Sequence, residues 1–327
     1  MALRPPGLGR LPRLPLAHLP TPLVPLPRMS KEAGTEVWIK RDDLTGVGLG
    51  GNKARKLEFL AADARACHAD VLVTGGGPGS NHVQLTAAAA ARLGMACHAV
   101  LYGSPPQPEP ANLGLARLFG ATISFTKSED RSSVDQELES VAEGLRSQGR
   151  RPYVIPRGGA SPVGCCGYVE GAFELQAQVD AAGISPTHLF VATGSSGTQA
   201  GLVLGAALAE GSYQIVGVTV SRPQAECLTR IAALASGCAD LIGVAFRDDE
   251  RNVIVLDGYL GPGYGKPSTE GVAAARLAAA TEGLVLDPTF TAKAMAALLA
   301  ETQAGHLPGP VVFVHTGGLG GVFGGAP

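Results

Sequence analysis

Short apolar runs rich in Val, Ile and Leu alternate along this chain with glycine-containing turns and alanine-rich runs. The run at residues 71–74 is followed by a glycine loop and by an alanine-rich run at 84–93. Further runs typical of strands lie at residues 96–101, 121–125, 188–193, 213–220 and 311–315. Runs typical of helices lie at residues 112–119, 133–147, 164–182, 198–209, 223–235, 269–282 and 288–304. Alternation of this kind is typical of βα units, so the pattern predicts an α/β fold with open parallel sheets.

Two stretches interrupt the βα pattern and mark candidate domain boundaries. Residues 42–51 are dense in glycine, and residues 149–156 combine charge with proline. A chain of 327 residues is long enough for about two domains. We therefore expect a small domain at residues 51–156, inserted into a large domain formed by residues 1–50 and 157–327.

Charge and hydropathy exclude several classes of protein. The formal net charge is −2 and the basic residues are scattered, whereas a nucleic-acid surface needs a clustered basic excess. No apolar run reaches the roughly 18 residues that span a bilayer. Prolines interrupt the first 30 residues, where a signal peptide would need an unbroken apolar stretch. We expect no nucleic-acid partner and no membrane segment, and we interpret the charged residues 247–251 as a solvated loop or helix end.

The six cysteines do not form a recognisable framework. Their positions are 67, 97, 165, 166, 227 and 238. No Cys-x-x-Cys pair and no Cys/His set with zinc spacing occurs among them. The sequence therefore predicts free thiols in a reducing compartment, no metal site and a cytoplasmic location.

Lys53 follows a glycine-rich loop at residues 48–51. A lysine there can enter a cleft at the start of a helix, where desolvation and the helix dipole lower the pKa of its amine. A free primary amine is the group that forms a Schiff base with an aldehyde cofactor. The alternative is that Lys53, Arg55 and Lys56 are surface residues of a helix.

A second glycine-rich loop, at residues 194–201, follows an apolar strand. Its glycines and hydroxyl side chains can present N–H and O–H donors to a phosphate at a helix start. The dinucleotide fingerprint G-x-G-x-x-G is absent, so the loop fits a monophosphate better than a dinucleotide. A plain βα turn is the alternative.

Ser80, Asn81 and His82 follow a third glycine loop at residues 75–79. They can offer hydroxyl, amide and helix-end N–H groups to a carboxylate or a ring oxygen. For Ser80 the alternative is a helix N-cap, and for His82 it is a structural histidine.

Thr316 ends the last strand, and ligands of open α/β sheets lie at the carboxyl ends of strands. We therefore take Thr316 as a candidate cofactor contact. Residues 261–267 resemble a P-loop but lack its first glycine, and Pro267 stands where Ser or Thr should bind magnesium.

Five segments occur together in a characteristic order. They are GNKARKLE at residues 51–58, SNH at 80–82, TGSSGTQAG at 193–201, GPGYG at 261–265 and TGG at 316–318. With these segments the chain resembles the D-cysteine desulfhydrase and 1-aminocyclopropane-1-carboxylate (ACC) deaminase family of pyridoxal-phosphate (PLP) enzymes. The resemblance runs over nearly the whole chain.

The resemblance implies a two-domain open-sheet PLP fold of the tryptophan synthase β type. The large domain would hold the phosphate, and the inserted smaller domain would carry the site for the substrate carboxylate. The residues expected to contact the cofactor are Asn52, Lys53, Lys56, Asn81, Thr193, Gly194, Ser195, Ser196, Gly197, Thr198 and Thr316. The residues expected to contact the substrate are Ser80, Asn81, His82, Tyr264 and Phe290. Lys53, Ser80 and Tyr264 would be catalytic, with Lys53 bonded to the cofactor.

Two positions depart from the family pattern. The ACC-deaminating branch has a tyrosine followed by a glutamate where this chain has Phe290 and Thr291, and that glutamate faces the pyridine nitrogen. Here the hydroxyl of Thr316 is expected in its place. A hydroxyl stabilises a protonated ring less than a carboxylate does, which favours β-elimination over cyclopropane opening. Phe290 also replaces the tyrosine common in the desulfhydrase branch, so the sequence does not decide the identity of the substrate.

The resemblance thus implies β-elimination from D-cysteine, which gives sulfide, pyruvate and ammonia. Lys53 or Ser80 would move the Cα proton. Alternatives are an L-cysteate sulfo-lyase, another PLP amino-acid lyase or deaminase, a non-catalytic PLP- or amino-acid-binding protein, and a phosphosugar-binding protein. The presence of both Lys53 and Ser80 favours an enzyme. Besides a small amino acid, the expected partner is a second copy in a homodimer, the default for soluble enzymes.

Overall fold

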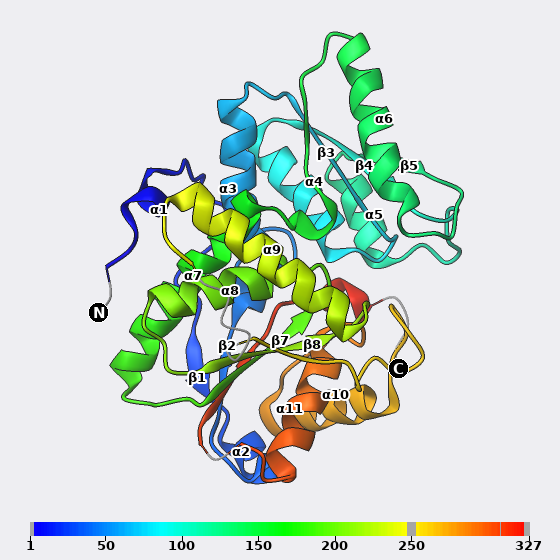
Figure 1. The fold of residues 1–327 in the computed structure, drawn as a ribbon. Helices are drawn as coiled ribbons and strands as arrows, with labels where there is room; N and C mark the ends of the chain where they lie inside the picture. Colours follow the sequence, from blue (N-terminus) through cyan, green and yellow to red (C-terminus); the bar gives the residue numbers. More distant parts are fainter. Residues whose placement is uncertain (1–2, 247–252, 308, 324–327) are drawn as a thin grey trace.

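The computed structural model describes residues 3–246, 253–307 and 309–323. These residues form two lobes, each with a sheet at its centre (Figure 1). The predicted α/β fold with mainly parallel strands is confirmed. The charged segment 247–251, interpreted as a solvated loop or helix end, lies outside the described residues.

The large lobe contains a six-stranded sheet with the strand order β1-β2-β10-β7-β8-β9. Its strands are β1 (Leu23–Pro25), β2 (Val37–Lys40), β7 (His188–Thr193), β8 (Gln214–Thr219), β9 (Val253–Leu256) and β10 (Val311–Val314). Every neighbouring pair is parallel except β1 with β2. Because β10 pairs with both β2 and β7, the two ends of the chain meet in this sheet.

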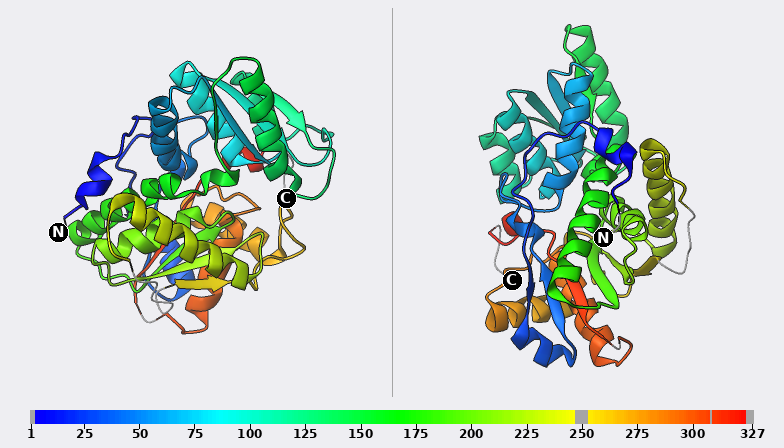
Figure 2. Two further views of the ribbon diagram at one scale, coloured as in Figure 1. Left: turned by 45° about the horizontal axis from the view of Figure 1, so that its top comes forward. Right: turned by 90° about the vertical axis from the view of Figure 1, so that its left-hand side faces the viewer.

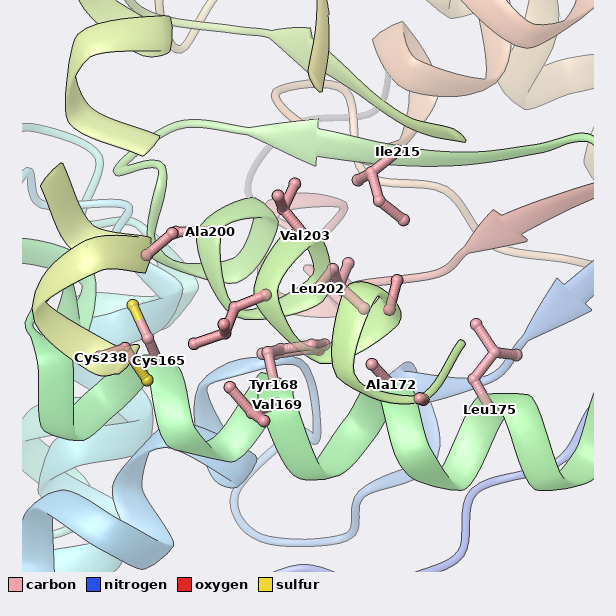
Figure 3. Close-up of a cluster of buried hydrophobic side chains, with 14 of the residues drawn as sticks. Cys165, Tyr168, Val169, Ala172, Leu175, Ala200, Leu202, Val203, Ile215 and Cys238 are labelled. Atoms are coloured by element: carbon pink, nitrogen blue, oxygen red, sulfur yellow. The ribbon is translucent and has the colours of Figure 1, made fainter. Parts of the chain in front are cut away.

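Helices bury both faces of the large sheet (Figure 2). One face carries α7 (Pro162–Ala182), α8 (Gly197–Leu208) and α9 (Gln224–Ile242), and the other carries α2 (Pro27–Ala33), α10 (Thr269–Glu282) and α11 (Thr291–Gln303). Figure 3 shows the contact between α7 and α8, with Tyr168 and Ala172 of α7 on the side of α8 away from Ile215. The two helices pack closely there, because a Cβ built on Gly201 would lie 2.6 Å from Cβ of Tyr168 and one on Gly205 would lie 2.6 Å from Cβ of Ala172. The N-terminal α1 (Pro6–Arg10) packs against α9 through the buried Leu8.

The small lobe contains a four-stranded parallel sheet with the order β5-β4-β3-β6. Its strands are β3 (Val71–Gly76), β4 (Ala96–Leu101), β5 (Thr122–Phe125) and β6 (Pro152–Val154). α3 (Lys53–Ala66), α4 (Asn81–Leu93) and α5 (Ala111–Leu118) cover one face, and α6 (Ser133–Ser147) covers the other. All four strands lie within residues 51–156, and on this basis we propose the domain boundaries 1–50 with 157–327, and 51–156.

Several predicted bounds were wrong. The pattern missed the four short strands β1, β2, β6 and β9. It placed Gly75 and Gly76 in a loop, whereas both belong to β3. It also ended α9 at residue 235 instead of Ile242, and began α11 at residue 288 instead of Thr291. In the last case the carboxylate of Asp287 accepts hydrogen bonds from the backbone N–H groups of residues 289–291, so the helix starts only after that turn.

Three 3-10 helices complete the described chain, namely η1 (Asp42–Leu44), η2 (Arg157–Gly159) and η4 (Leu319–Gly321). Among the described residues, no helix combines the length and apolar character needed to cross a membrane. All six cysteines are free thiols, as predicted.

Candidate active site

A pocket between the two sheets brings most of the predicted site residues together. Its walls include the segments that follow β3, β7, β8 and β10, so it lies at the carboxyl ends of the strands, as is usual in open α/β sheets. The predicted residues in its wall are Asn52, Lys53, Ser80, Asn81, His82, Thr193, Gly194, Ser195, Ser196, Thr198, Tyr264, Phe290 and Thr316. Lys56 and Gly197 lie just behind this wall.

Lys53 is the first residue of α3 and lines the pocket. Desolvation lowers the pKa of its amine well below the usual value, and the nearby charge of Lys56 lowers it further. Both effects favour a neutral amine. The alternative that Lys53, Arg55 and Lys56 lie on a helix surface is wrong, because Arg55 and Lys56 are fully buried and Lys53 lines the pocket.

Close backbone packing fixes the start of α3 against the end of β10. Gly51 has a φ of +122°, and a Cβ built on it would lie 2.9 Å from the carbonyl oxygen of Thr316. The N–H of Asn52 donates to the same carbonyl at 3.0 Å. Only glycine meets both the φ and the space, so the glycine-rich loop serves to place Lys53 beside Thr316.

The loop between β7 and α8 forms a cradle at a helix start. Ser196 has a left-handed backbone (φ 68°), and its buried Oγ has no hydrogen-bond partner among the described residues. A Cβ on Gly197 would lie 2.8 Å from Nζ of Lys56 and 3.1 Å from Cα of Ala160. Burial lowers the pKa of Lys56 to about 8, and its Nζ donates to the carbonyl of Gly158 at 3.2 Å. The cradle thus combines a helix N-terminus with an unused hydroxyl and a cation.

Two hydroxyls beside the cradle already have partners. Oγ1 of Thr193 donates to Oε1 of Gln199 at 2.6 Å, and Gln199 in turn donates to the carbonyl of Ile254. Oγ1 of Thr198 accepts from Nδ2 of Asn52 at 3.0 Å. The hydroxyl hydrogen of Thr198 is therefore free to donate to a ligand, whereas the hydroxyl hydrogen of Thr193 is used in the bond to Gln199.

Ser80 and Asn81 lie at the start of α4. Oγ of Ser80 accepts from the N–H of Val83 at 3.3 Å, which confirms the N-cap alternative, and the same residue also lines the pocket. Oδ1 of Asn81 accepts from Nδ2 of Asn112 at 2.8 Å. This bond leaves Nδ2 of Asn81 to donate into the pocket. Asn112, which the sequence did not single out, thereby orients a predicted site residue.

His82 combines a structural bond with a place in the pocket wall. Its Nε2 lies 2.9 Å from Oγ1 of Thr74, which itself donates to the carbonyl of Ile155. Nε2 must therefore carry the hydrogen, which leaves Nδ1 as an acceptor that is buried without a partner among the described residues. Desolvation, followed by the charges of Lys53 and Lys56, lowers the pKa of His82 well below its usual value, so the ring is neutral.

Tyr264 and Phe290 form an aromatic wall beside the cradle, since a Cβ built on Gly194 would lie 3.4 Å from Cε1 of Phe290. Their ring centroids lie 6.1 Å apart in an edge-on arrangement, and the guanidinium of Arg131 lies 4.1 Å from the centroid of the Tyr264 ring. Desolvation raises the pKa of Tyr264 to about 12, so its hydroxyl keeps its proton. Sequence reasoning missed Arg131 and three further pocket arginines, because none of them belongs to a motif.

The profile of the family described as "Pyridoxal-phosphate dependent enzyme" matches residues 14–317. The chain belongs to this family. It is 42% identical over 324 residues to a D-cysteine desulfhydrase of Klebsiella pneumoniae (strain 342), covering 97% of each chain. It is 43% identical to a D-cysteine desulfhydrase of Yersinia pestis (strain Pestoides F), covering 97% of this chain and 96% of that one.

Two solved structures share the fold of this chain. A crystal structure described as an ACC deaminase homologue superposes with a TM-score of 0.91 at 37% identity, covering 97% of this chain and 94% of that one. The processed form of threonine deaminase isoform 2 from Solanum lycopersicum superposes with a TM-score of 0.67 at 18% identity, covering 95% of this chain and 82% of that one, which supports the fold alone. The predicted PLP fold is confirmed.

The pocket fits the cofactor of its family. The first N–H groups of α8 have no partner within the helix and can bind a phosphate, together with the unused Oγ of Ser196. The missing Cβ of Gly197 keeps Lys56 close to this cradle. Lys53 offers the amine that binds an aldehyde, and the free Nδ2 of Asn81 can donate to a ring oxygen.

Proposed function

We propose that this PLP-dependent enzyme is a β-elimination lyase that acts on D-cysteine and releases sulfide, pyruvate and ammonia. The observation that carries the proposal is the lowered pKa of Lys53 in a pocket that also holds a phosphate cradle and Ser80. The D-cysteine desulfhydrases that are 42–43% identical over nearly the full length support the choice of substrate.

Lys53 supplies the base in this proposal. PLP, when bound, supplies an electron sink for the Cα carbanion of the substrate. A neutral Lys53 amine can take the Cα proton at neutral pH, and its desolvated surroundings keep it neutral. Proton transfer by a positioned side chain contributes about 10²–10⁴-fold to a rate. No other described lysine lines the pocket.

Ser80 and the start of α4 bind the substrate carboxylate in this proposal. Oγ of Ser80 accepts from the N–H of Val83, so its own hydrogen is free to donate into the pocket. The positive end of the α4 dipole favours an anion at the same place. Ser80 can thus hold the carboxylate, or exchange a proton at Cα.

Tyr264, Phe290 and Arg131 close the pocket over the substrate. The Tyr264 hydroxyl stays protonated and can donate to the leaving sulfur. The ring of Phe290 excludes water without offering a hydroxyl of its own. His82 and Asn81 line the pocket from the start of α4, where neutral His82 adds no charge to the site.

Thr316 supports elimination over cyclopropane opening. We place its hydroxyl at the pyridine nitrogen, since Thr316 lines the pocket at the end of β10. The neighbouring carboxylate of Asp287 does not line the pocket. It already accepts hydrogen bonds from the backbone N–H groups of residues 289–291. A pyridine ring whose nitrogen has no carboxylate partner is a weaker electron sink. This suits a substrate whose leaving group departs quickly.

One experiment tests the function. The purified protein with PLP should show a visible absorbance band that Lys53→Ala removes, and it should release sulfide and pyruvate from D-cysteine. L-cysteine, L-cysteate and ACC are offered in parallel, with sulfide, sulfite and ketoacid as readouts. A colourless protein that gains no band with PLP, or ketobutyrate from ACC as the main product, contradicts the proposal.

We also propose that the enzyme works as a homodimer in the cytoplasm. Free, mostly buried thiols suit a reducing compartment, and symmetric dimers are the usual state of soluble enzymes. Light scattering at several protein concentrations tests the assembly, and a monomer mass throughout contradicts it.

A further inference from the structure

Four arginines line the pocket that holds Lys53. Arg131 lies between β5 and α6, and Arg157 lies in η2. Arg222 follows β8, and Arg230 lies in α9. The first two follow strands of the small sheet and the last two follow a strand of the large one, so both lobes contribute positive charge to one space.

The described carboxylates neutralise only two of these arginines. Arg157 donates to both carboxylate oxygens of Asp135, at 2.7 and 2.5 Å, and Arg222 pairs with Glu226 one helical turn away. Arg131 and Arg230 form no ion pair with a described carboxylate. Asp135 is also the only carboxylate among the described residues that line the pocket. The pocket therefore holds an excess of positive charge.

Two of the guanidinium groups are also left with unused donors. Nε of Arg222 and Nε of Arg230 are buried, and neither has a hydrogen-bond partner among the described residues. Desolvation, and next to it the charge of Arg222, lowers the pKa of Arg230, although Glu226 acts in the opposite direction. Buried donors and like charges in proximity cost free energy unless an anion binds between them.

The two anionic groups already assigned to the pocket have other partners. The phosphate of the cofactor has the α8 cradle with Lys56. The substrate carboxylate has Ser80 at the start of α4. Arg131 instead stacks on Tyr264 and donates to the carbonyl of Ser221 at 3.5 Å, on the aromatic side of the pocket. The unpaired arginines, Arg131 and Arg230, are therefore available to bind a third anionic group.

We propose that the site recognises amino acids whose β-substituent carries an anionic group such as a sulfonate, a phosphate or a carboxylate. This inference rests on the proposed β-elimination and names its substrate class. D-Cysteine fits the same place because the hydrosulfide that leaves from it is itself an anion. Arg131 and Arg230, the two arginines without a described carboxylate partner, bind the anion, Arg131 from the small lobe and Arg230 from α9.

The arginines also assist bond cleavage. The Cα–H and Cβ–X bonds break, and the substituent X leaves with the bonding electron pair. Water then converts the three-carbon product to pyruvate and ammonia, so O-phosphoserine yields phosphate, pyruvate and ammonia with no net oxidation. Guanidinium groups placed at the departing anion stabilise the charge that develops on it.

A pair of similar substrates tests the inference by activity. O-Phosphoserine and O-acetylserine of the same enantiomer differ mainly in the charge of the substituent, and pyruvate reports both reactions. We expect kcat/KM for O-phosphoserine to be larger by about tenfold or more. The double substitution Arg131→Gln with Arg230→Gln should lower this ratio at least about tenfold. The matched change Arg146→Gln, at an exposed arginine on α6, should leave the ratio unaltered.

A binding experiment without turnover completes the test. 3-Sulfopropionate and butyrate both lack an amine, so neither reacts with the cofactor, and only the first carries a second anion. Calorimetry on the holoenzyme should show tighter binding of 3-sulfopropionate, with an advantage that salt and the double substitution remove. Equal affinities, or a ratio of kcat/KM near one, overturn the inference. Pyruvate from D-cysteine would still support the proposed function in that case, whereas its absence with every substrate contradicts the function itself.

Discussion

The guanidinium of Arg55 donates two parallel hydrogen bonds of 2.8 Å to the carboxylate of Asp42, and both side chains are almost fully buried. Glu174 accepts from the same guanidinium at 2.8 and 3.0 Å and from Lys40 at 2.5 Å. The hydroxyl of Tyr168 donates to Asp42 at 2.6 Å. Because Arg55 lies in the first turn of α3, this buried network fixes the helix that begins with the proposed catalytic lysine.

Removing the cation at the centre of this network should strongly destabilise the fold. Arg55→Met leaves Asp42 and Glu174 buried without their main partner, and breaking a buried ion pair costs about 3–5 kcal/mol. Urea unfolding followed by circular dichroism measures the loss. The control Arg146→Met removes an exposed arginine that pairs only with Glu143 and should cost under about 1 kcal/mol. Equal losses in the two variants would show that the network does not stabilise the protein.

Acidic pH should lower the free energy of unfolding over a pH range that is set by the pKa of Asp42. Desolvation opposes ionisation of this carboxyl, but Arg55 outweighs it and holds the pKa at about 2, below the ordinary value of 3.8. A depressed pKa contributes stability above pH 3.8, which is lost as the pH falls through 2. The contribution is about 2 kcal/mol. Urea unfolding between about pH 5 and pH 2 measures it, and an Asp42→Asn variant with an undiminished slope would contradict the assignment.

Local signals predicted part of the fold well. The bounds of β7, α6 and α10 match the predicted ranges, because an apolar run or a helical period defines each of them from its own residues. β1 and β6 have three residues each and were missed. Strands this short take their stability from the neighbours with which they pair, and a local pattern does not contain that information.

The residues of the candidate site were likewise predicted only in part. The residues in contiguous glycine-containing motifs, such as Lys53, Ser80 and Ser196, do line one pocket or its cradle. Asn112 lies 31 residues from its partner Asn81. Arg230 belongs to no motif, and its importance arises from burial and from the charges around it. Contacts between distant segments exist only in the folded chain, so the sequence did not reveal them.

Asn112 should act on the cofactor through Asn81. Its Nδ2 donates to Oδ1 of Asn81 at 2.8 Å and to the carbonyl of Gly79 at 2.9 Å, which fixes the direction of the Asn81 amide. Asn112→Ala should weaken PLP binding by about tenfold, the effect of losing one positioned hydrogen bond, and shift the visible absorbance maximum. Titration of the cofactor-free protein with PLP measures both. The double variant with Asn81→Ala should be no worse than Asn81→Ala alone, and additive losses would argue against a positioning role.

A methyl group at Gly197 should selectively weaken the cofactor site. The new Cβ would lie 2.8 Å from Nζ of Lys56, so the amine must move away from the cradle at the start of α8. We expect Gly197→Ala to raise the Kd for PLP by about tenfold or more, since a charge-assisted bond to the phosphate is lost. Gly144→Ala is the matched control, because a Cβ on this helical glycine meets no atom within 4 Å. That variant should bind PLP normally and gain about 0.5–1 kcal/mol of stability from the better helix former. Fluorescence titration with PLP and urea unfolding compare the two variants, and an unchanged Kd in Gly197→Ala would remove Lys56 from the proposed phosphate site.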